Sequence, residues 1–320
     1  MSSAHQLSEF ALIQRFFKPQ KISHPSTRLG IGDDCALLSI PDGYELAVTT
    51  DTMVENVHFF ADVDPELLGH KLLAVNLSDL AAMGAKPLSV SLALTLPGVD
   101  EAWLASFSKG FSALAQRYNV DLIGGDTTSG PLTLTVQALG LVPQGKALKR
   151  SNAKPGDFVY VTGPLGDAGL GLKIKQGYQC SVPGFSPDTA LIRFNQPEPQ
   201  VNAGLALLDV ANACIDISDG LSSDLGHILE QSGVGACIDW QALPLSSAVQ
   251  CYIEESQDWL MPLMAGDDYE LCFTVSPENV DRLTIACTQI GVIEAQPGLR
   301  LHKAGRLQSL EAKGFEHFSK

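Results

Sequence analysis

The sequence lacks any pair of cysteines with metal-binding spacing. Seven cysteines are spread over 320 residues, their number is odd, and none form a C-x-x-C motif. Most occupy apolar stretches such as "ACIDI" and "ELCFTV", where cysteine behaves as a small hydrophobic residue. This usage indicates a reducing compartment and argues against structural zinc.

Positive charge is also scarce. Lys and Arg number 21 against 36 Asp and Glu, which gives a formal net charge of −15. Nucleic acids and anionic membranes are held by basic faces, so neither is an expected partner. No stretch approaches the about 18 apolar residues of a membrane span, and "MSSAHQLSEF" shows no basic segment followed by an apolar run. We therefore expect a cytoplasmic protein.

Several well-known phosphate and calcium signatures are missing. The chain contains no G-x-x-x-x-G-K-[ST] loop, no H-R-D and D-F-G set, and no EF-hand loop. A P-loop enzyme, a protein kinase and a calcium sensor are therefore disfavoured. The glycine-rich turn "GPLGDAGLG" at 163–171 is a weak signal by itself, and packing of the following helix on its sheet is the favoured explanation.

Length and segment pattern predict two domains. A chain of 320 residues exceeds what one core usually spans, and the polar stretch "RSNAKPGD" marks a boundary. We expect domains over 1–149 and 150–320, of class α/β or α+β with mixed sheets. The N-terminal pattern predicts strands at 44–50, 88–96, 120–126 and 132–142 and helices at 65–84 and 100–119. Further on it predicts strand–turn–helix units in "FVYVTGPLGDAGLGLKI" and "ACIDISDGLSSDLGHILEQSG", a turn and strand in "MAGDDYELCFTV", and a helix in "NVDRLTIACTQIG".

Aspartates gather at predicted strand ends and glycine turns, next to Gly, Ser or Thr. Such strand ends are where open sheets build their sites. Taken singly, each aspartate is most often a turn residue or a helix cap. Taken together they predict a site for hard cations, because Mg²⁺ is held by a few carboxylates plus substrate phosphates. The aspartates in this context are Asp33, Asp34, Asp51, Asp126, Asp216, Asp219, Asp267 and Asp268.

Asp79 has a different context, inside the apolar helical segment "LLAVNLSDLAAMG". Asn76 and Asp79 are three residues apart and share a helix face. The alternative is a solvent-facing break in the apolar stripe. The leucine and alanine neighbours argue against it, and an unpaired carboxylate is expensive to bury.

Six motifs occur in an order that resembles a known family. They are "GIGDDCALL", "TTDTMVENVHF", "NLSDLAAMGAKP", "LIGGDTTSGPL", "IDISDGLSSDLGHI" and "GDDYELCF". Together they are similar to the thiamine-monophosphate kinase family. That family belongs to the ATP-binding superfamily that includes aminoimidazole ribonucleotide synthetase and selenophosphate synthetase. The resemblance runs from near residue 8 to the C-terminus, and "TDTMVENVHF" and "GDDYELCF" point to this kinase in particular.

The resemblance implies a fold, a reaction and partners. The fold is two α/β domains of the aminoimidazole ribonucleotide synthetase type, in a homodimer whose N-terminal sheets join in a barrel-like core. The N-terminal domain would bind ATP and metal and form the dimer, and the C-terminal domain would complete the nucleotide and substrate site. The implied reaction transfers the γ-phosphate of ATP to thiamine monophosphate, giving thiamine diphosphate and ADP, with several Mg²⁺ ions as cofactors.

The resemblance also implies metal ligands. In "LGIGDDCALL", Gly30 and Gly32 allow a tight turn and Asp34 would face the cations. Asp33 is either a second ligand or a cap of the turn. The residues that correspond to the family's metal ligands are Asp34, Thr49, Thr50, Asp51, Asp79, Asp126, Asp216 and Asp219.

Nucleotide and substrate contacts carry over in the same way. Where the family usually reads Gly-Gly-Glu-Asp-Tyr-Glu-Leu, this chain has "AGDDYEL", so Asp267 is one methylene shorter than the usual Glu. The implied nucleotide contacts are Gly125, Asp126, Arg150 and Ser218. The implied substrate contacts are His58, Asp267 and Phe315.

The chemistry of such a reaction agrees with the residue types. A phosphate acceptor is largely a dianion at neutral pH, so no general base is needed and none is expected. The barrier is the meeting of two polyanions, which requires charge neutralisation and in-line positioning. Two alternatives stay open: another ATP-dependent enzyme of the same superfamily, and a non-catalytic protein that binds metal and nucleotide.

Overall fold

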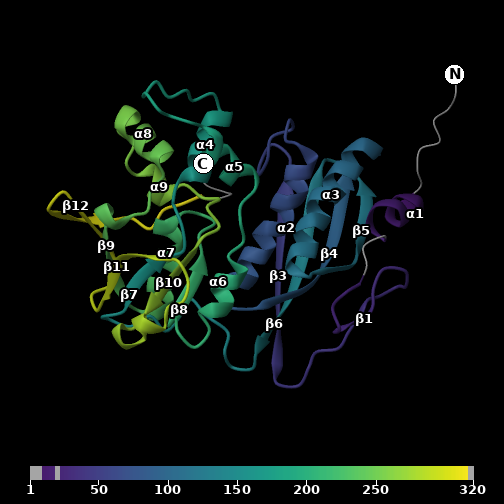
Figure 1. The fold of residues 1–320 in the computed structure, drawn as a ribbon, viewed down its shortest axis with the longest axis horizontal. Coiled ribbons are helices and arrows are strands. Elements are labelled where there is room, and N and C mark those ends of the chain that lie inside the picture. The colour runs from purple at the N-terminus through teal and green to yellow at the C-terminus, as the bar shows by residue number, and fades with distance from the viewer. Residues whose placement is uncertain (1–8, 19–21, 316–320) are drawn as a thin grey trace. The chain divides into compact units, whose positions relative to one another are not determined.

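The computed structural model describes residues 9–18 and 22–315 and divides into two compact units (Figure 1). The first unit comprises Met1–Leu80 and Lys86–Gly145, and the second comprises Ala81–Ala85 and Lys146–Lys320. Among the residues described, none of the helices is both long enough and apolar enough to span a membrane.

The first unit is built on a mixed four-stranded sheet in the order β3-β6-β4-β5. β6 runs antiparallel to both β3 and β4, whereas β4 and β5 are parallel. Its described elements are α1 (Glu9–Leu12), a π-helical turn (Ile13–Phe17), β1 (Thr27–Leu29), β2 (Leu37–Leu38), β3 (Tyr44–Val54), α2 (Pro65–Ala82), β4 (Lys86–Leu96), α3 (Glu101–Tyr118), β5 (Asp121–Ser129) and β6 (Thr133–Pro143).

Helices α2 and α3 are packed closely together in this unit (Figure 1). Gly69 and Gly110 permit the contact, because a Cβ at Gly69 would lie 2.2 Å from the Phe107 carbonyl oxygen and one at Gly110 would lie 1.9 Å from that of Glu66. α2 is buried on most of its sides, which explains why its sequence is apolar rather than amphipathic. The Asp100 carboxylate caps α3 by accepting from the backbone N–H of Ala102 at 2.9 Å.

The second unit contains a seven-stranded sheet in the order β13-β12-β9-β11-β7-β10-β8. β12 and β9 are parallel, and the other neighbours are antiparallel. Its strands are β7 (Phe158–Val161), β8 (Ala213–Asp216), β9 (Gly235–Asp239), β10 (Leu271–Val275), β11 (Thr288–Glu294), β12 (Gly298–Lys303) and β13 (Arg306–Leu310). Its helices are α4 (Asp167–Lys175), α5 (Asp188–Asn195), α6 (Val201–Ala206), α7 (Leu221–Ser232), α8 (Ser247–Ser256) and α9 (Met261–Met264), with 3-10 turns at Trp240–Ala242 and Pro277–Arg282.

A hydrophobic core joins α7 to this sheet. Leu225 and Ile228 of α7 are fully buried in one cluster with Ile215 of β8 and Ile238 of β9. A smaller cluster lies between α4, α5, α8 and α9, around Leu170 and Val249. The mixed α/β class is therefore confirmed in both units, and the described elements include the two expected N-terminal helices as α2 and α3.

Three expected elements are wrong in part. The strand predicted at 44–50 does not end before Asp51 but continues through it to Val54, and the strand predicted at 120–126 continues through Asp126 to Ser129. Both aspartates thus lie within strands. The helix predicted at 279–291 is a 3-10 turn followed by strand β11. β11 pairs with β7 on one side and β9 on the other, and this long-range pairing outweighs local helix propensity.

Candidate active site

Four polar residues come together between β3 and α2 of the first unit. Thr49 and Asp51 are two residues apart on β3 and lie on the same face of the strand as the buried Met53. The Thr49 hydroxyl donates to the Asp79 carboxylate, and the backbone N–H of Asp51 donates to the Asn76 side-chain oxygen at 3.2 Å. Asn76 and Asp79 share one face of α2, so the strand and the helix each supply two oxygen-bearing side chains.

Electrostatics make this cluster receptive to a cation. Burial, followed by the neighbouring charge of Asp79, raises the pKa of the Asp51 carboxyl to about 7. Two carboxyl groups are thus held close to one another in a partly desolvated place. The available donors are carboxylate, hydroxyl and amide oxygens, which is the donor set that Mg²⁺ prefers.

A complete metal cage is not preformed within the described part of the chain. Over residues 9–18 and 22–315, no three side chains of the His, Cys, Asp or Glu type are grouped so that they could hold a metal ion. Mg²⁺ is commonly bound by one or two carboxylates together with substrate phosphates. The residues around Asp51 therefore fit an ion that arrives with a nucleotide better than a resident structural ion.

Asp126 lies apart from Asp51 within the first unit. Strand pairing aligns Asp126 with Ala93, Thr135 and Thr52 across the sheet. The hydroxyls of Thr52 and Thr135 are 2.9 Å apart on this face. Asp51 belongs to the adjacent row and the opposite face, and three strand spacings of about 4.8 Å separate β3 from β5 by about 14 Å. The strand register therefore places the two aspartates on different strands and in different rows of the sheet.

The backbone conformation and the close packing at position 125 require glycine. Its φ is +153°, and a Cβ there would lie 1.8 Å from the Leu92 carbonyl oxygen on β4. A side chain at this position would therefore separate β5 from β4. The neighbouring Asp126 side chain is exposed.

The other first-unit candidates lie in turns or on the exposed sheet face. Asp33 and Asp34 are exposed beside Gly32, whose φ is +135°. Thr50 points to the face of β3 opposite Asp51. His58 accepts a hydrogen bond from the Val54 backbone N–H at 2.9 Å through Nδ1, which places the proton of the neutral ring on Nε2.

Five of the six second-unit candidates lie around one loop, residues 217–220, between β8 and α7. Asp216 is the buried last residue of β8, and Ser218 and Asp219 follow it. The Asp267 backbone N–H donates to the Ser218 carbonyl oxygen at 2.8 Å, and the Phe315 backbone N–H donates to that of Asp219 at 3.0 Å. Main-chain hydrogen bonds therefore join the nucleotide and metal candidates of this unit to its substrate candidates.

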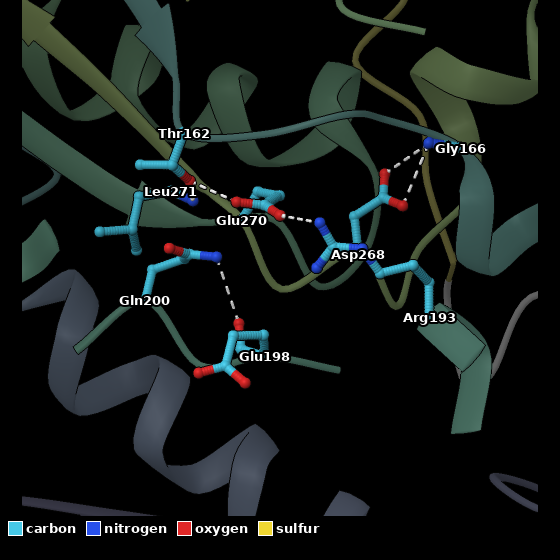
Figure 2. A network of polar contacts seen from close by, with 8 residues as sticks. All are labelled: Thr162, Gly166, Arg193, Glu198, Gln200, Asp268, Glu270 and Leu271. Carbon is cyan, nitrogen blue, oxygen red and sulfur yellow. Dashed lines mark hydrogen bonds and ion pairs between the residues drawn. The ribbon is translucent and has the colours of Figure 1, made fainter. Parts of the chain in front are cut away.

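Asp267 is held in an unusual backbone conformation. Its φ is 69° and that of Tyr269 is 50°, and the Tyr269 hydroxyl donates to the Asp267 carboxylate at 3.0 Å. Between them, Asp268 accepts from the Gly166 backbone N–H at 2.9 and 3.1 Å (Figure 2). Burial raises the pKa of the Asp268 carboxyl well above its ordinary value. The loop is thereby tied to the beginning of α4.

Glu270 anchors the other end of the same loop. Its carboxylate accepts from the Thr162 hydroxyl at 2.6 Å and forms an ion pair of 3.2 Å with Arg193 (Figure 2). The Thr162 hydroxyl oxygen accepts from the Leu271 backbone N–H at 2.8 Å. Glu270 is 1% exposed, and burial raises the pKa of its carboxyl while Thr162 and Arg193 oppose that shift.

Two implied contacts lie at exposed positions. The Arg150 side chain is exposed in the segment before β7, and its carbonyl oxygen accepts from the Ser232 hydroxyl at 3.3 Å. Phe315 is 52% exposed. Both side chains are therefore accessible to a ligand.

Sequence reasoning missed two residues that shape these loops. Asp224, in the first turn of α7, accepts three backbone hydrogen bonds from residues 218–220. In the sequence, its place in the first turn of the helix marks it only as a helix-start residue. Tyr269 lies within the motif "GDDYELCF", and its position two residues after Asp267 is the one indication of a contact that the sequence offers.

Family models cover most of the chain. The model described as AIR synthase related protein, N-terminal domain, matches residues 32–142. The model described as AIR synthase related protein, C-terminal domain, matches residues 154–303.

Curated relatives and solved structures agree with these matches. Thiamine-monophosphate kinase of Escherichia coli is 48% identical over 322 residues, covering 97% of this chain and 98% of the relative. The crystal structure of thiamine-monophosphate kinase from Stenotrophomonas maltophilia has a TM-score of 0.84 at 40% identity, covering 94% of this chain and 98% of that one. The structure of AaThiL complexed with AMPPCP and TMP has a TM-score of 0.78 at 30% identity, covering 99% of this chain and 100% of that one.

Proposed function

Because the chain belongs to the thiamine-monophosphate kinase family, within the AIR synthase related proteins, we propose that it transfers the γ-phosphate of ATP to thiamine monophosphate, giving thiamine diphosphate and ADP. The observation that carries the proposal is 48% identity over 97% of the chain to a curated enzyme of that name. The solved relative complexed with AMPPCP and TMP supports the same pair of substrates.

Magnesium is the cofactor that the acidic residues suit. When bound, Mg²⁺ would neutralise phosphate charge and align the reacting oxygens. In the first unit, the proposed ligands are Asp34, Thr49, Thr50, Asp51, Asp79 and Asp126. In the second unit, they are Asp216 and Asp219. The raised pKa of Asp51 supports this assignment, because a carboxyl that burial, and then the neighbouring Asp79, push toward neutrality is one that a cation would ionise.

The remaining assignments follow the chemistry of the two substrates. Thiamine carries a cationic thiazolium, which a carboxylate such as Asp267 attracts and an aromatic ring such as Phe315 can face. The His58 Nε2–H can donate to the acceptor phosphate. Since this phosphate is largely a dianion near neutral pH, the residues have to position it rather than deprotonate it. The proposed nucleotide contacts are Gly125, Asp126, Arg150 and Ser218.

We further propose that the protein is a cytoplasmic homodimer formed through the first unit. The N-terminal domain, 1–149, would then provide dimerisation with ATP and metal binding, and 150–320 the rest of the nucleotide and substrate contacts. Tyr44, Leu46 and Val48 are 46%, 39% and 55% exposed in a row on β3, which is an edge strand. Exposed apolar side chains on a long edge strand favour pairing with another chain. Sedimentation of the purified protein tests the dimer.

ADP release across several acceptors tests the reaction. The proposal requires Mg²⁺-dependent ADP release with thiamine monophosphate and none with thiamine. Turnover with a different acceptor but not with thiamine monophosphate would instead identify another enzyme of the superfamily. Binding of ATP without turnover on any acceptor would leave a non-catalytic protein.

Two substitutions test the metal assignment. Asp51→Asn and Asp126→Asn are expected to remove most activity while the protein stays folded, because each replaces a proposed ligand oxygen pair by a neutral amide. Near-normal turnover in both variants, with folding checked by circular dichroism, would exclude the assignment.

A further inference from the structure

Asp224 has an arrangement of hydrogen bonds that its place in a helix does not require. It lies in the first turn of α7 and is 2% exposed. Its Oδ2 accepts from the backbone N–H groups of Ser218, Asp219 and Gly220 at 3.0, 3.0 and 3.1 Å. Three consecutive amides thus converge on a single carboxyl oxygen.

The carbonyl groups of the same loop face other segments. Those of Ser218 and Asp219 accept from the backbone N–H groups of Asp267 and Phe315, and that of Ile217 accepts from the Tyr269 N–H at 2.8 Å. The loop 217–220 therefore lies between Asp224 on its amide side and the substrate-binding candidates on its carbonyl side.

The surroundings leave little room for this loop to move. A Cβ at Gly266 would lie 2.2 Å from the Ser218 carbonyl oxygen, and one at Gly314 would lie 2.2 Å from that of Asp219. Gly220 has a φ of +113°, and a Cβ there would lie 2.7 Å from the Met264 carbonyl group. The segments that contain Gly266 and Gly314 thus lie directly against the loop backbone. A small shift of the loop backbone therefore displaces both segments.

We propose that Asp224 is a positioning residue that sets the spacing between Ser218 and Asp219 on one side and Asp267 and Phe315 on the other. The inference rests on the proposed function, since those four residues are assigned to nucleotide, metal and substrate there. Asp224 itself is 2% exposed. It acts through the loop, whose three amides it holds and whose carbonyls hold the two substrate segments.

A purely structural role makes a different prediction. If Asp224 served only to stabilise the N-terminus of α7, its loss would lower stability and leave the affinity of the folded protein for both substrates unchanged. Positioning through the loop requires that affinity for the nucleotide and for thiamine monophosphate fall together, because both sets of contacts depend on the same backbone.

The chain offers a matched control in Asp157. This residue is also 2% exposed in the second unit, and its carboxylate accepts from the Lys154 backbone N–H and the Asn212 side-chain amide, both at 2.9 Å. It is not among the residues proposed to bind metal, nucleotide or substrate. Asp157→Asn therefore removes a buried carboxylate of similar kind from outside the proposed site.

The test compares Asp224→Asn, Asp224→Ala and Asp157→Asn in the full-length protein. For Asp224→Asn we expect the KM values for Mg·ATP and for thiamine monophosphate both to rise, with kcat/KM falling by about 10- to 100-fold, the range found for residues that orient ligands. Asp224→Ala should fall further, because alanine offers no acceptor. Asp157→Asn should stay within about twofold of wild type even if it lowers Tm.

Hydrogen exchange supplies a readout that does not depend on activity. The amides of residues 218–220 should exchange slowly in the wild type and at least about tenfold faster in Asp224→Asn, with no such change in Asp157→Asn. If Asp224→Asn leaves both KM values and these amides like those of the Asp157→Asn control, the inference is wrong. If the wild type releases no ADP with thiamine monophosphate, the proposed function fails, and exchange at 218–220 still decides whether Asp224 holds the loop.

Discussion

Replacing Asp51 by Asn should make the metal-free protein more stable while it removes activity. Asp51 is partly desolvated beside Asp79, and these two causes raise its pKa from 3.8 to about 7. Above that pH, the folded protein has to hold the ionised carboxylate against its surroundings. Asn has nearly the same shape and carries no charge, so it avoids this penalty.

The size of the effect follows from the shift in pKa. A rise from 3.8 to about 7 has an upper limit of about 4 kcal/mol at about 1.4 kcal/mol per pKa unit. The side chain retains some contact with water, which screens the interaction and reduces the expected gain to roughly 1–2 kcal/mol. In a unit of this size that is a rise in Tm of about 2–8 °C.

The sign of the pH dependence provides a sharper test. Between about pH 4 and pH 7 the folded protein keeps a proton on Asp51 that the unfolded chain has released, so stability falls as pH rises through this window. The advantage of Asp51→Asn should therefore be small near about pH 4 and fully present near about pH 8.

Thermal unfolding in the presence of a chelator measures both quantities. Asp126→Asn is the control, because it removes the same charge from an exposed side chain and should change stability by less than about 0.5 kcal/mol. Saturating Mg²⁺ should stabilise the wild type more than Asp51→Asn, because it binds the folded state. The reasoning would be refuted if Asp51→Asn were no more stable than wild type near about pH 8. It would also be refuted if the stability difference between variant and wild type were the same at the low and the high pH.

Two further predictions concern the scaffold. Gly125→Ala should lose about 2–4 kcal/mol in chemical denaturation, because its Cβ would lie 1.8 Å from a β4 carbonyl oxygen; Gly124→Ala, where a Cβ meets no atom within 4 Å, is the control, and equal losses at both would contradict this account. Arg193→Met should lose about 3–5 kcal/mol by leaving Glu270 buried without its ion pair. Adding Glu270→Gln should restore part of that stability, and the absence of any recovery would show that the ion pair is not the cause.

Much of the fold could be predicted from local pattern. The segment that forms α3 has an amphipathic repeat and begins after Asp100, a good capping residue, so its existence and its start are both encoded nearby. The prediction of a helix at 279–291 is wrong for the opposite reason. Its residues form β11 because β7 and β9 provide pairing on both sides, and that information is not local to the segment.

In the candidate site, too, some features follow from local spacing and others depend on long-range packing. Thr49 and Asp51 are two residues apart on a strand, and Asn76 and Asp79 are three apart on a helix, so each pair could be placed on one face from spacing alone. That the two faces meet depends on how α2 packs on the sheet. The strand order β3-β6-β4-β5 is equally non-local, and it is what places Asp126 on the edge opposite Asp51.

Asp224 could not be recognised because its role is expressed through the backbone. In the sequence it is one more polar residue in "SDGLSSDL", where a helix is about to begin. Its three partners are backbone amide groups, which every residue except proline carries. The residue types at 218–220 therefore do not indicate the interaction. Only the folded loop shows that these amides share one acceptor.

The left-handed backbone at Asp267 limits which residues can serve there. Aspartate and asparagine reach a φ near 69° more readily than glutamate does, because their short side chains bond to the local backbone. A glutamate would offer greater reach but would adopt this conformation at a higher energy. At this position the reach of the side chain and the conformation of the backbone therefore favour different residues, and the shorter side chain is the better occupant of the loop.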